Sequence, residues 1–207
     1  MKKKQKTTFL LLTCLCLLGF NLKESELKLT ASKNSLDLKE IHSTVKSYQD
    51  FPKKGIVFQD ILPIFEKPKV LEKIVSHLEK RYKGHVDSVV GLDARGFIFG
   101  AVLAARLKVP FVPVRKKGKL PGPCYEASYT KEYGEDRFEM SKLVFKGKER
   151  VLVVDDLIAT GGSARAALSL IKKAGARAVE FFAFSKVKGL KGTESLDVKS
   201  YILLEGK

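Results

Sequence analysis

The chain has 207 residues, of which 44% are hydrophobic and 30% charged, so a body of roughly 170 residues can fold around one core as a single domain. Its 39 Lys and Arg against 23 Asp and Glu give a formal net charge of +16, a balance that can indicate nucleic-acid binding. The basic residues are spread along the chain, without a dense basic stripe interleaved with aromatics, so we expect no nucleic-acid partner.

The first 34 residues differ in composition from the rest. MKKKQKTT precedes FLLLTCLCLLGF, residues 9–20, an arrangement typical of a secretory signal or a short anchor. The run is shorter than the roughly 20 apolar residues that span a membrane, and no clear small-residue cleavage site follows it. We interpret 1–34 as an extension whose alternatives are export, tethering or a start assigned too far upstream. Residues 35–207 are expected to form the folded domain, with no stable membrane association.

The next segments alternate between helix and strand patterns. Apolar residues share one face of a helix predicted at about 68–82, and an apolar strand follows at 86–91. The sequence GLDARGFIFG, residues 91–100, then opens a helix that runs through Leu107. A helix N-terminus directly after a strand is a favourable place for an anion, and the guanidinium of Arg95 can donate two parallel hydrogen bonds to phosphate oxygens.

A strand at 111–115 leads into a long connection. The segment RKKGKLPGPCYEASYTKEYG, residues 115–134, greatly exceeds the usual connection of about 4–6 residues, and long loops of this kind are often active-site lids. Two short segments, 125–130 and 136–141, predict a hairpin within the lid. Cys124 is far from Cys14 and Cys16, so the three cysteines indicate no disulfide framework.

The run VLVVDDLIATGGSARAA, residues 151–167, is the most informative part of the chain. Its uninterrupted apolar start predicts a central parallel strand at 151–155, which ends in Asp155 and Asp156. Ligands bind at the carboxyl ends of such strands. A loop of small residues follows, and the helix at about 163–174 directs its positive end to the same place, so the loop predicts a phosphate site. The loop comprises Ala159, Thr160, Gly161, Gly162 and Ser163.

Strands at 179–184 and 200–204 complete the pattern. Alternating strands and helices predict an α/β fold with a doubly wound, mostly parallel sheet flanked by helices. The glycines fit neither common nucleotide motif, because the chain has no G-x-G-x-x-G here and no G-K-[ST] after the glycines.

The strand, the two acids and the T-G-G loop resemble the signature of the type I phosphoribosyltransferases. Together with FPKKGIVFQDILPIF at 51–65, GLDARGFIFG and the 115–134 segment, in this order and spacing, residues 35–207 resemble the adenine phosphoribosyltransferases. The resemblance implies the type I fold with a small hood and a flexible lid loop. It also implies a non-proline cis peptide at Asp93–Ala94.

The resemblance assigns roles at the sugar and pyrophosphate sites. Asp155 and Asp156 would hold the ribose hydroxyls of 5-phosphoribosyl 1-pyrophosphate (PRPP), and the loop from Ala159 to Ser163 would hold its 5′-phosphate. Glu132 would be the catalytic residue that transfers a proton at N7 of adenine, and Tyr133 would abut the ribose. The pyrophosphate would be bound by Arg95 and basic lid residues, namely Arg115, Lys116 and Lys119, with Lys117 beside them.

The adenine site would lie under the hood. Phe58 would offer its ring face, the backbone at Val57 and Gln59 would bind the purine edge, and Val187 would form the opposite wall. The chain departs from the family pattern at three positions, with Gln59 for the common Arg, Lys186 for an acid and Lys131 for a leucine.

The implied reaction converts adenine and PRPP to AMP and pyrophosphate in purine salvage. It would use Mg²⁺ held mainly by pyrophosphate and ribose hydroxyls, so no protein ligand is assigned to the metal. A homodimer is implied, in which a lid arginine or lysine can reach the neighbouring site. PRPP and magnesium are intracellular, so we expect the catalytic body to be cytoplasmic. The alternatives are a phosphoribosyltransferase for another purine base, such as xanthine, and a PRPP-binding regulator without activity.

Overall fold

The fold is built on a seven-stranded sheet, with strand order β5-β6-β4-β3-β7-β8-β9. The structure, a computed structural model, describes residues 36–131 and 134–206. All the elements belong to Asp37–Lys207, the second of the two units into which the chain divides. The pairs β4–β3, β3–β7, β7–β8 and β8–β9 are parallel, whereas β5 and β6 pair antiparallel with each other and β6 pairs antiparallel with β4. The prediction of a mostly parallel sheet is confirmed.

The strands of the sheet lie close to their predicted positions but most are longer. Their bounds are β3 Ser88–Leu92, β4 Phe111–Lys116, β5 Cys124–Lys131, β6 Gly134–Ser141, β7 Arg150–Ile158, β8 Arg177–Lys186 and β9 Ser200–Glu205. The central strand β7 is buried along almost its whole length, and it pairs with a neighbour on both sides at Val151–Val154. Burial on both faces explains why this segment lacks the polar alternation of a half-exposed strand.

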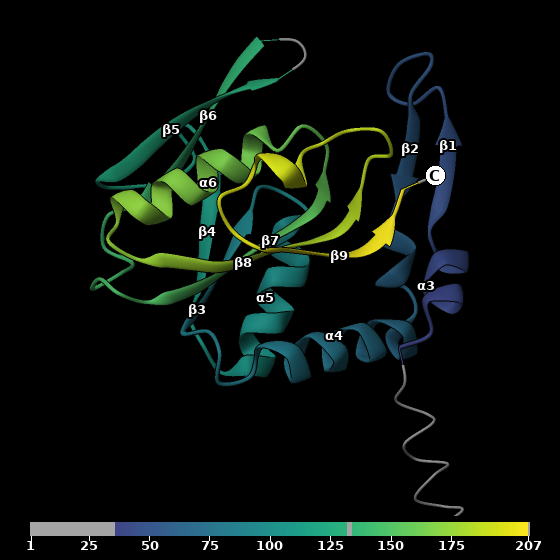
Figure 1. Ribbon diagram of the computed structural model, residues 1–207, viewed down its shortest axis with the longest axis horizontal. Helices are drawn as coiled ribbons and strands as arrows, with labels where there is room; N and C mark the ends of the chain where they lie inside the picture. The colour runs from purple at the N-terminus through teal and green to yellow at the C-terminus, as the bar shows by residue number, and fades with distance from the viewer. Residues whose placement is uncertain (1–35, 132–133, 207) are drawn as a thin grey trace, which may run out of the picture. The chain divides into compact units, whose positions relative to one another are not determined.

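Helices cover both faces of the sheet (Figure 1). Helix α6, Gly162–Lys173, packs on one face, while α4, Pro68–Tyr82, and α5, Gly96–Leu107, lie on the other. The predicted helix at 68–82 is confirmed to the residue. Because the chain leaves β3 toward one face and β7 toward the other, the connections diverge between these two strands. Open α/β sheets bind ligands at such a point.

A small second sheet forms the hood. Strands β1, Lys46–Gln49, and β2, Val57–Asp60, pair antiparallel beyond helix α3, Leu38–Thr44. The side chain of Asp37 caps α3 by accepting from the N–H of Lys39 at 2.9 Å. Two short 3₁₀ turns complete the fold, η1 at Leu62–Ile64 and η2 at Thr193–Ser195.

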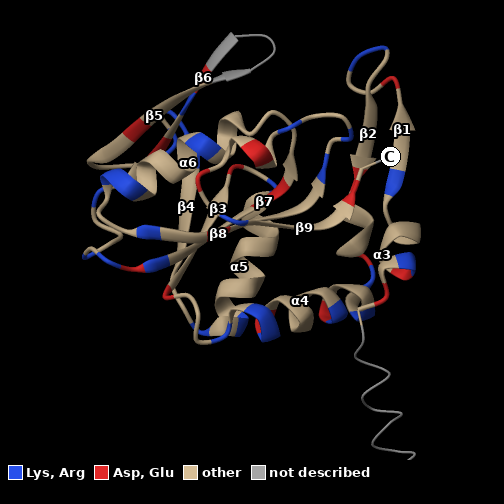
Figure 2. Ribbon diagram, viewed as in Figure 1, with Lys and Arg blue, Asp and Glu red and all other residues tan. Residues whose placement is uncertain are grey.

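The basic residues do not gather on one element. Figure 2 shows Lys and Arg on α4, at both ends of α6 and in the loop between β1 and β2. Within the described ranges, no helix is both long and apolar enough to cross a membrane.

Candidate active site

Two adjacent carboxylates lie where strand β3 ends beside β7. The β3–β7 ladder stops at Gly91↔Val154, whereas β7 stays paired with β8 up to Ile158. Asp155 and Asp156 therefore lie inside the strand, not at its end as predicted, because pairing with the long strand β8 extends β7 beyond its apolar run. The edge of β7 that β3 leaves open faces the 93–95 loop, where the peptide Asp93–Ala94 is cis, as the resemblance implied.

The two carboxylates differ in their surroundings. Asp156 pairs with Arg95, whose Nε lies 2.8 Å from Oδ2. Asp155 accepts a hydrogen bond from the backbone N–H of Asp156 at 2.9 Å. Burial and the neighbouring charge of Asp156 raise the pKa of Asp155 well above its ordinary value. Asp155 therefore keeps its proton to a higher pH than an ordinary aspartate does.

A close backbone approach brings Arg95 to this position. Helix α5 begins at Gly96, directly after Arg95. A Cβ on Gly96 would lie 2.6 Å from the carbonyl oxygen of Val154 and 3.2 Å from Cα of Asp155. Only glycine lets the start of α5 lie this close to β7, and that approach places the Arg95 guanidinium beside Asp156.

The 159–163 loop joins β7 to α6 and reaches the helix through Gly161. This residue has φ +80°, a left-handed conformation that glycine adopts without strain. The first N–H groups of α6 have no acceptor within the helix, and the helix dipole is positive at this end. The loop therefore has the geometry of an anion site.

Two residues that the sequence analysis did not identify support this loop from behind. A Cβ on Gly192 would lie 2.2 Å from the carbonyl oxygen of Ala159, so the segment before η2 packs directly on the loop. Arg165 donates from Nη1 to the carbonyl oxygen of Thr160 at 3.0 Å, and it also contacts Ser195 Oγ. No sequence motif marks these positions, because they act through loop packing.

The carboxylates, the loop and Arg95 line one cavity of about 540 Å³. Nine of the residues predicted for sugar or pyrophosphate binding line it: Arg95, Lys116, Asp155, Asp156, Ala159, Thr160, Gly161, Gly162 and Ser163. Tyr129 and Phe138 of the lid hairpin also line it, although the sequence analysis did not propose them. Glu132 and Tyr133 lie outside the described residues, so their assigned roles stay predictions.

Arg115 and Lys119 line neither this cavity nor the one described next. Arg115 Nε lies 3.4 Å from Asp93 Oδ2, and its Nη1 donates to the carbonyl oxygen of Lys119 at 3.1 Å. Glu139 on β6, 5% exposed, accepts from the N–H groups of Lys119 and Leu120 at 2.8 Å each. Arg115 and Glu139 thus fix the basic turn that follows β4.

The pKa of Glu139 reflects this arrangement. Burial alone would raise it, but hydrogen bonds from the N–H groups of Leu120, Gly118 and Lys119 outweigh burial and leave the pKa below its ordinary value. Glu139 therefore remains ionised while it holds the turn.

A second cavity of about 390 Å³ lies between the hood and the ends of β7 and β8. All four residues predicted for base binding line it, namely Val57, Phe58, Gln59 and Val187. The two cavities share Arg95, Asp156, Leu157 and Ala159. Arg95 lies at this junction, with its guanidinium carbon 5.2 Å from the ring centre of Phe58.

The backbone of β2 offers a free edge to this second cavity. The carbonyl oxygen of Ile56 points toward β1, since it accepts from the N–H of Phe51 at 3.2 Å. Backbone groups of an extended strand alternate in direction, so those of Val57 and Gln59 point to the opposite edge. Of the described strands, only β1 pairs with β2. These donors and acceptors can therefore bind the edge of a planar ligand.

Lys186 brings a positive charge to the wall of the second cavity. Its Nζ lies 2.8 Å from Glu205 Oε1 on the paired strand β9. The carboxylate of Glu205 neutralises the positive charge of Lys186, which stands where the family commonly has an acid.

The carboxylate oxygens of Asp93, Asp155 and Asp156 in the first cavity are hard ligands of the kind that Mg²⁺ prefers. In the part of the chain that the structure describes, no group of three or more His, Cys, Asp or Glu side chains could hold a metal ion unaided. These three carboxylates fit an ion whose remaining oxygen ligands come from a bound substrate.

Comparisons with known proteins agree with this geometry. The family described as "Phosphoribosyl transferase domain" matches residues 64–204. Adenine phosphoribosyltransferase of Candida albicans is 47% identical over 174 residues, which cover 82% of this chain and 90% of that protein. The Caenorhabditis elegans enzyme of the same name is 48% identical over 160 residues, covering 76% and 86%.

Solved structures give the same result for the fold. The adenine phosphoribosyltransferase of Saccharomyces cerevisiae, complexed with an imino-altritol bisphosphate and adenine, superposes with a TM-score of 0.78 at 42% identity, covering 84% of this chain and 99% of that one. The Giardia lamblia enzyme complexed with 9-deazaadenine has a TM-score of 0.78 at 31% identity, covering 84% and 99%.

Proposed function

The chain belongs to the adenine phosphoribosyltransferases, a group within the phosphoribosyl transferase domain family, and we propose how its two joined cavities divide the reaction between them. The enzyme is a transferase that forms AMP and pyrophosphate from adenine and PRPP. The observation that carries the proposal is the junction at Arg95 and Asp156, because a polar anion cavity and a hood cavity meet there. A sugar at this junction has its phosphate on one side and its anomeric carbon facing the base.

The first cavity binds PRPP in this proposal. The loop from Ala159 to Ser163 holds the 5′-phosphate through its N–H groups, and Asp155 and Asp156 accept hydrogen bonds from the ribose hydroxyls. Arg95 and Lys116 bind the pyrophosphate, whose negative charge grows as the bond to the anomeric carbon breaks. A sugar hydroxyl that donates to Asp155 favours its charged form, so we expect PRPP binding to release a proton.

The second cavity binds adenine. Phe58 and Val187 enclose the ring, and the free edge of β2 at Val57 and Gln59 pairs with its polar edge. N9 of the base attacks the anomeric carbon as pyrophosphate departs, and Glu132 accepts the proton from N7 and returns it in the reverse direction. Tyr133 lies beside the ribose in this scheme.

Mg²⁺ is the proposed cofactor. Asp155 and Asp156, with pyrophosphate and ribose oxygens, would complete its shell of hard oxygen ligands. When bound, the ion neutralises charge on the leaving pyrophosphate.

We also propose a homodimer, formed through the exposed apolar side of α5. Ile98 is 38% and Val102 is 37% exposed on this helix, which begins beside the first cavity. A contiguous apolar helix face exposed to water commonly marks an interface. A lid arginine or lysine would then reach the neighbouring site. Sedimentation tests this, because Val102→Asp should give a monomer while wild type stays a dimer.

Residues 35–207 constitute the catalytic domain in this proposal, and 1–34 an extension. The catalytic body works in the cytoplasm, where PRPP and magnesium are available.

Formation of AMP from labelled adenine and PRPP tests the function, with unlabelled hypoxanthine, guanine and xanthine as competitors. We expect rapid AMP formation that the three oxopurines do not inhibit. Preferred use of an oxopurine would indicate a different base, and PRPP binding without any turnover would indicate a regulator.

A further inference from the structure

A third cavity lies behind the 159–163 loop, between α6, the start of β8 and the segment 195–198. Its volume is about 750 Å³, and it shares no lining residue with the two catalytic cavities. We name it the rear cleft. It is lined by Arg165, Leu168, Ser169, Lys172, Ala176, Arg177, Ala178, Ser195, Asp197 and Val198.

The rear cleft has an excess of positive charge. Arg165 and Lys172 lie seven residues apart, so they project from one face of α6 at a separation of about 10 Å along its axis. Arg177 begins β8 on the other side of the cleft. No ion pair within the described part of the chain neutralises any of the three, and Asp197 is the single carboxylate of the lining.

The remaining lining suits an organic phosphate better than a bare ion. Ser169 adds a hydroxyl group that can donate to a phosphate oxygen. Leu168 and Ala176 are buried beneath them and give the cleft an apolar floor. Cations and a hydroxyl over an apolar floor complement a ligand that carries both phosphates and an apolar ring.

Arg165 connects the rear cleft to the catalytic loop. Its Nη1 holds the carbonyl oxygen of Thr160 at 3.0 Å and contacts Ser195 Oγ, which in turn donates to the carbonyl oxygen of Gly192 at 2.7 Å. The segment at Gly192 packs on Ala159 without room for a Cβ. Among the described residues, neither Nε nor Nη2 of Arg165 has a hydrogen-bond partner, so both can bind an anion while Nη1 keeps its bond to the Thr160 carbonyl.

We propose that the rear cleft is a second phosphate site, which binds the oligophosphate group of a nucleotide and couples its binding to the 5′-phosphate loop. An anion that fixes Arg165 restricts the Thr160 carbonyl, and the loop then binds PRPP with less loss of freedom. Coupling of this kind is reciprocal, so a filled catalytic cavity strengthens binding in the rear cleft. The coupling rests on the proposed PRPP role of the loop, whereas the existence of the site does not.

Calorimetry with inorganic tripolyphosphate tests the site directly. The enzyme is first saturated with AMP and pyrophosphate. The heat of this first titration shows separately whether the catalytic cavities bind their own ligands. We expect tripolyphosphate then to bind one site per chain and Lys172→Ala/Arg177→Ala to weaken it tenfold or more. ATP in place of tripolyphosphate distinguishes a nucleotide, which binds more tightly by using the apolar floor, from a free polyphosphate.

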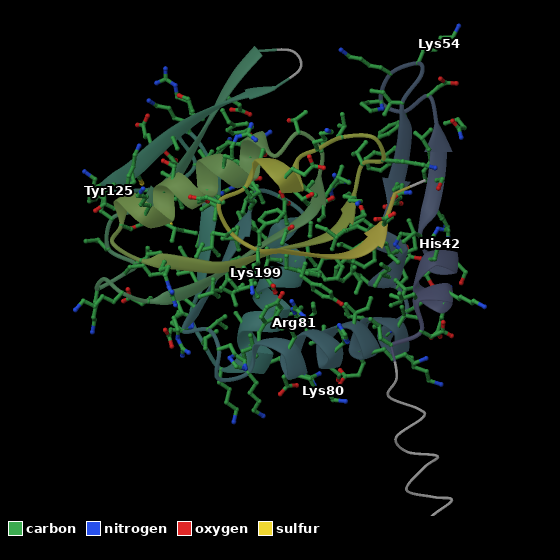
Figure 3. All side chains as sticks on the ribbon, in the orientation of Figure 1. His42, Lys54, Lys80, Arg81, Tyr125 and Lys199 are labelled. Atoms are coloured by element: carbon green, nitrogen blue, oxygen red, sulfur yellow. The ribbon has the colours of Figure 1, made fainter. Side chains whose placement is uncertain are left out.

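The matched control is Lys69→Ala/Lys80→Ala, which removes the same charge from α4. Both lysines are exposed, and α4 lies across the sheet from α6, as the label of Lys80 in Figure 3 shows. The control should bind tripolyphosphate within about twofold of wild type, because it lowers the general positive field of the protein as much as the test variant does but leaves the rear cleft intact. Equal weakening by both double variants, or no binding once the catalytic cavities are filled, would overturn the proposal.

Kinetics test the coupling. Tripolyphosphate should lower KM for PRPP about fivefold at unchanged kcat, and Lys172→Ala/Arg177→Ala should abolish this effect. Arg165→Lys keeps the charge but cannot hold both Thr160 and an anion, so it should retain binding and lose the coupling. Tight binding in the rear cleft with no change in KM for PRPP would refute the coupling and leave a site independent of catalysis.

Discussion

Replacement of Gly192 by alanine tests how the 159–163 loop is supported. Gly192 has φ −59°, which alanine adopts readily, so the substitution introduces no backbone strain of its own. The added Cβ would lie 2.2 Å from the carbonyl oxygen of Ala159 and 2.9 Å from the nitrogen of Gly161. A carbon and a carbonyl oxygen approach to about 3.3 Å, so the loop or the segment at 192 must move by about 1 Å.

The magnitude follows from that displacement. Overpacking of this kind costs about 1–3 kcal/mol, and in a domain of this size each kcal/mol lowers Tm by about 2–4 °C. A displacement of about 1 Å at a substrate-positioning group can lower the rate about 100-fold. We therefore expect Gly192→Ala to lower kcat/KM for PRPP by about 10- to 100-fold and Tm by several degrees.

The assay measures initial rates of AMP formation against PRPP concentration, together with thermal unfolding. Thr193→Ala is the control, because it places an alanine one residue further along the same turn. It should change kcat/KM by less than about threefold, as surface substitutions usually do. Wild-type values of both kcat/KM and Tm for Gly192→Ala would show that the loop does not depend on this packing.

Four further predictions address individual groups. Asp155→Asn with Asp156→Asn should lower turnover by orders of magnitude with an unchanged circular dichroism spectrum. Because folding raises the pKa of Asp155 well above 3.8, its ionisation opposes folding, so Asp155→Asn alone should raise Tm by an amount that grows as pH rises from 3.8 to the raised pKa and is constant above it. Glu139→Gln should cost about 1–3 kcal/mol in denaturant unfolding and raise KM for PRPP. Since folding lowers the pKa of Glu139 from its ordinary value of 4.5, this loss should be constant above that pH and shrink below it; a stability difference independent of pH would contradict the role of its charge. Glu132→Gln should slow the chemical step in single-turnover kinetics far more than it weakens PRPP binding, and an effect on binding alone would make Glu132 structural. A chain that starts at Ser35 should match the full chain in activity per site, whereas an inactive or unfolded product would show that residues 1–34 belong to the catalytic domain.

The sequence was sufficient for the elements whose burial leaves a pattern. The apolar run at 151–154 predicted the central strand because a strand covered on both faces needs apolar side chains throughout. A helical period of apolar residues located α4 to the residue, because a helix that packs on one side needs apolar side chains along that face. These residues are Leu71, Ile74, Val75 and Leu78. The end of β7 was predicted too early, since its last residues are set by pairing with β8 and not by their own side chains.

The supporting contacts of the site were not predictable in the same way. Arg165 and Glu139 act by holding backbone groups of loops, and nothing in a single sequence marks a side chain that binds a carbonyl or an N–H of another residue. Gly192 is one of 16 glycines, and only its distance to Ala159 distinguishes it. The first hood strand, β1, was also missed, because KSYQ is exposed along its length and lacks an apolar period.

A crystal structure of the enzyme with AMP tests the central claim most directly, because one ligand must enter both cavities at once. The account predicts the phosphate on the N–H groups of Ala159–Ser163, the ribose hydroxyls at Asp155 and Asp156, and the adenine against Phe58 with its polar edge on β2. AMP bound in the reverse orientation, or with its base outside the hood cavity, would contradict it.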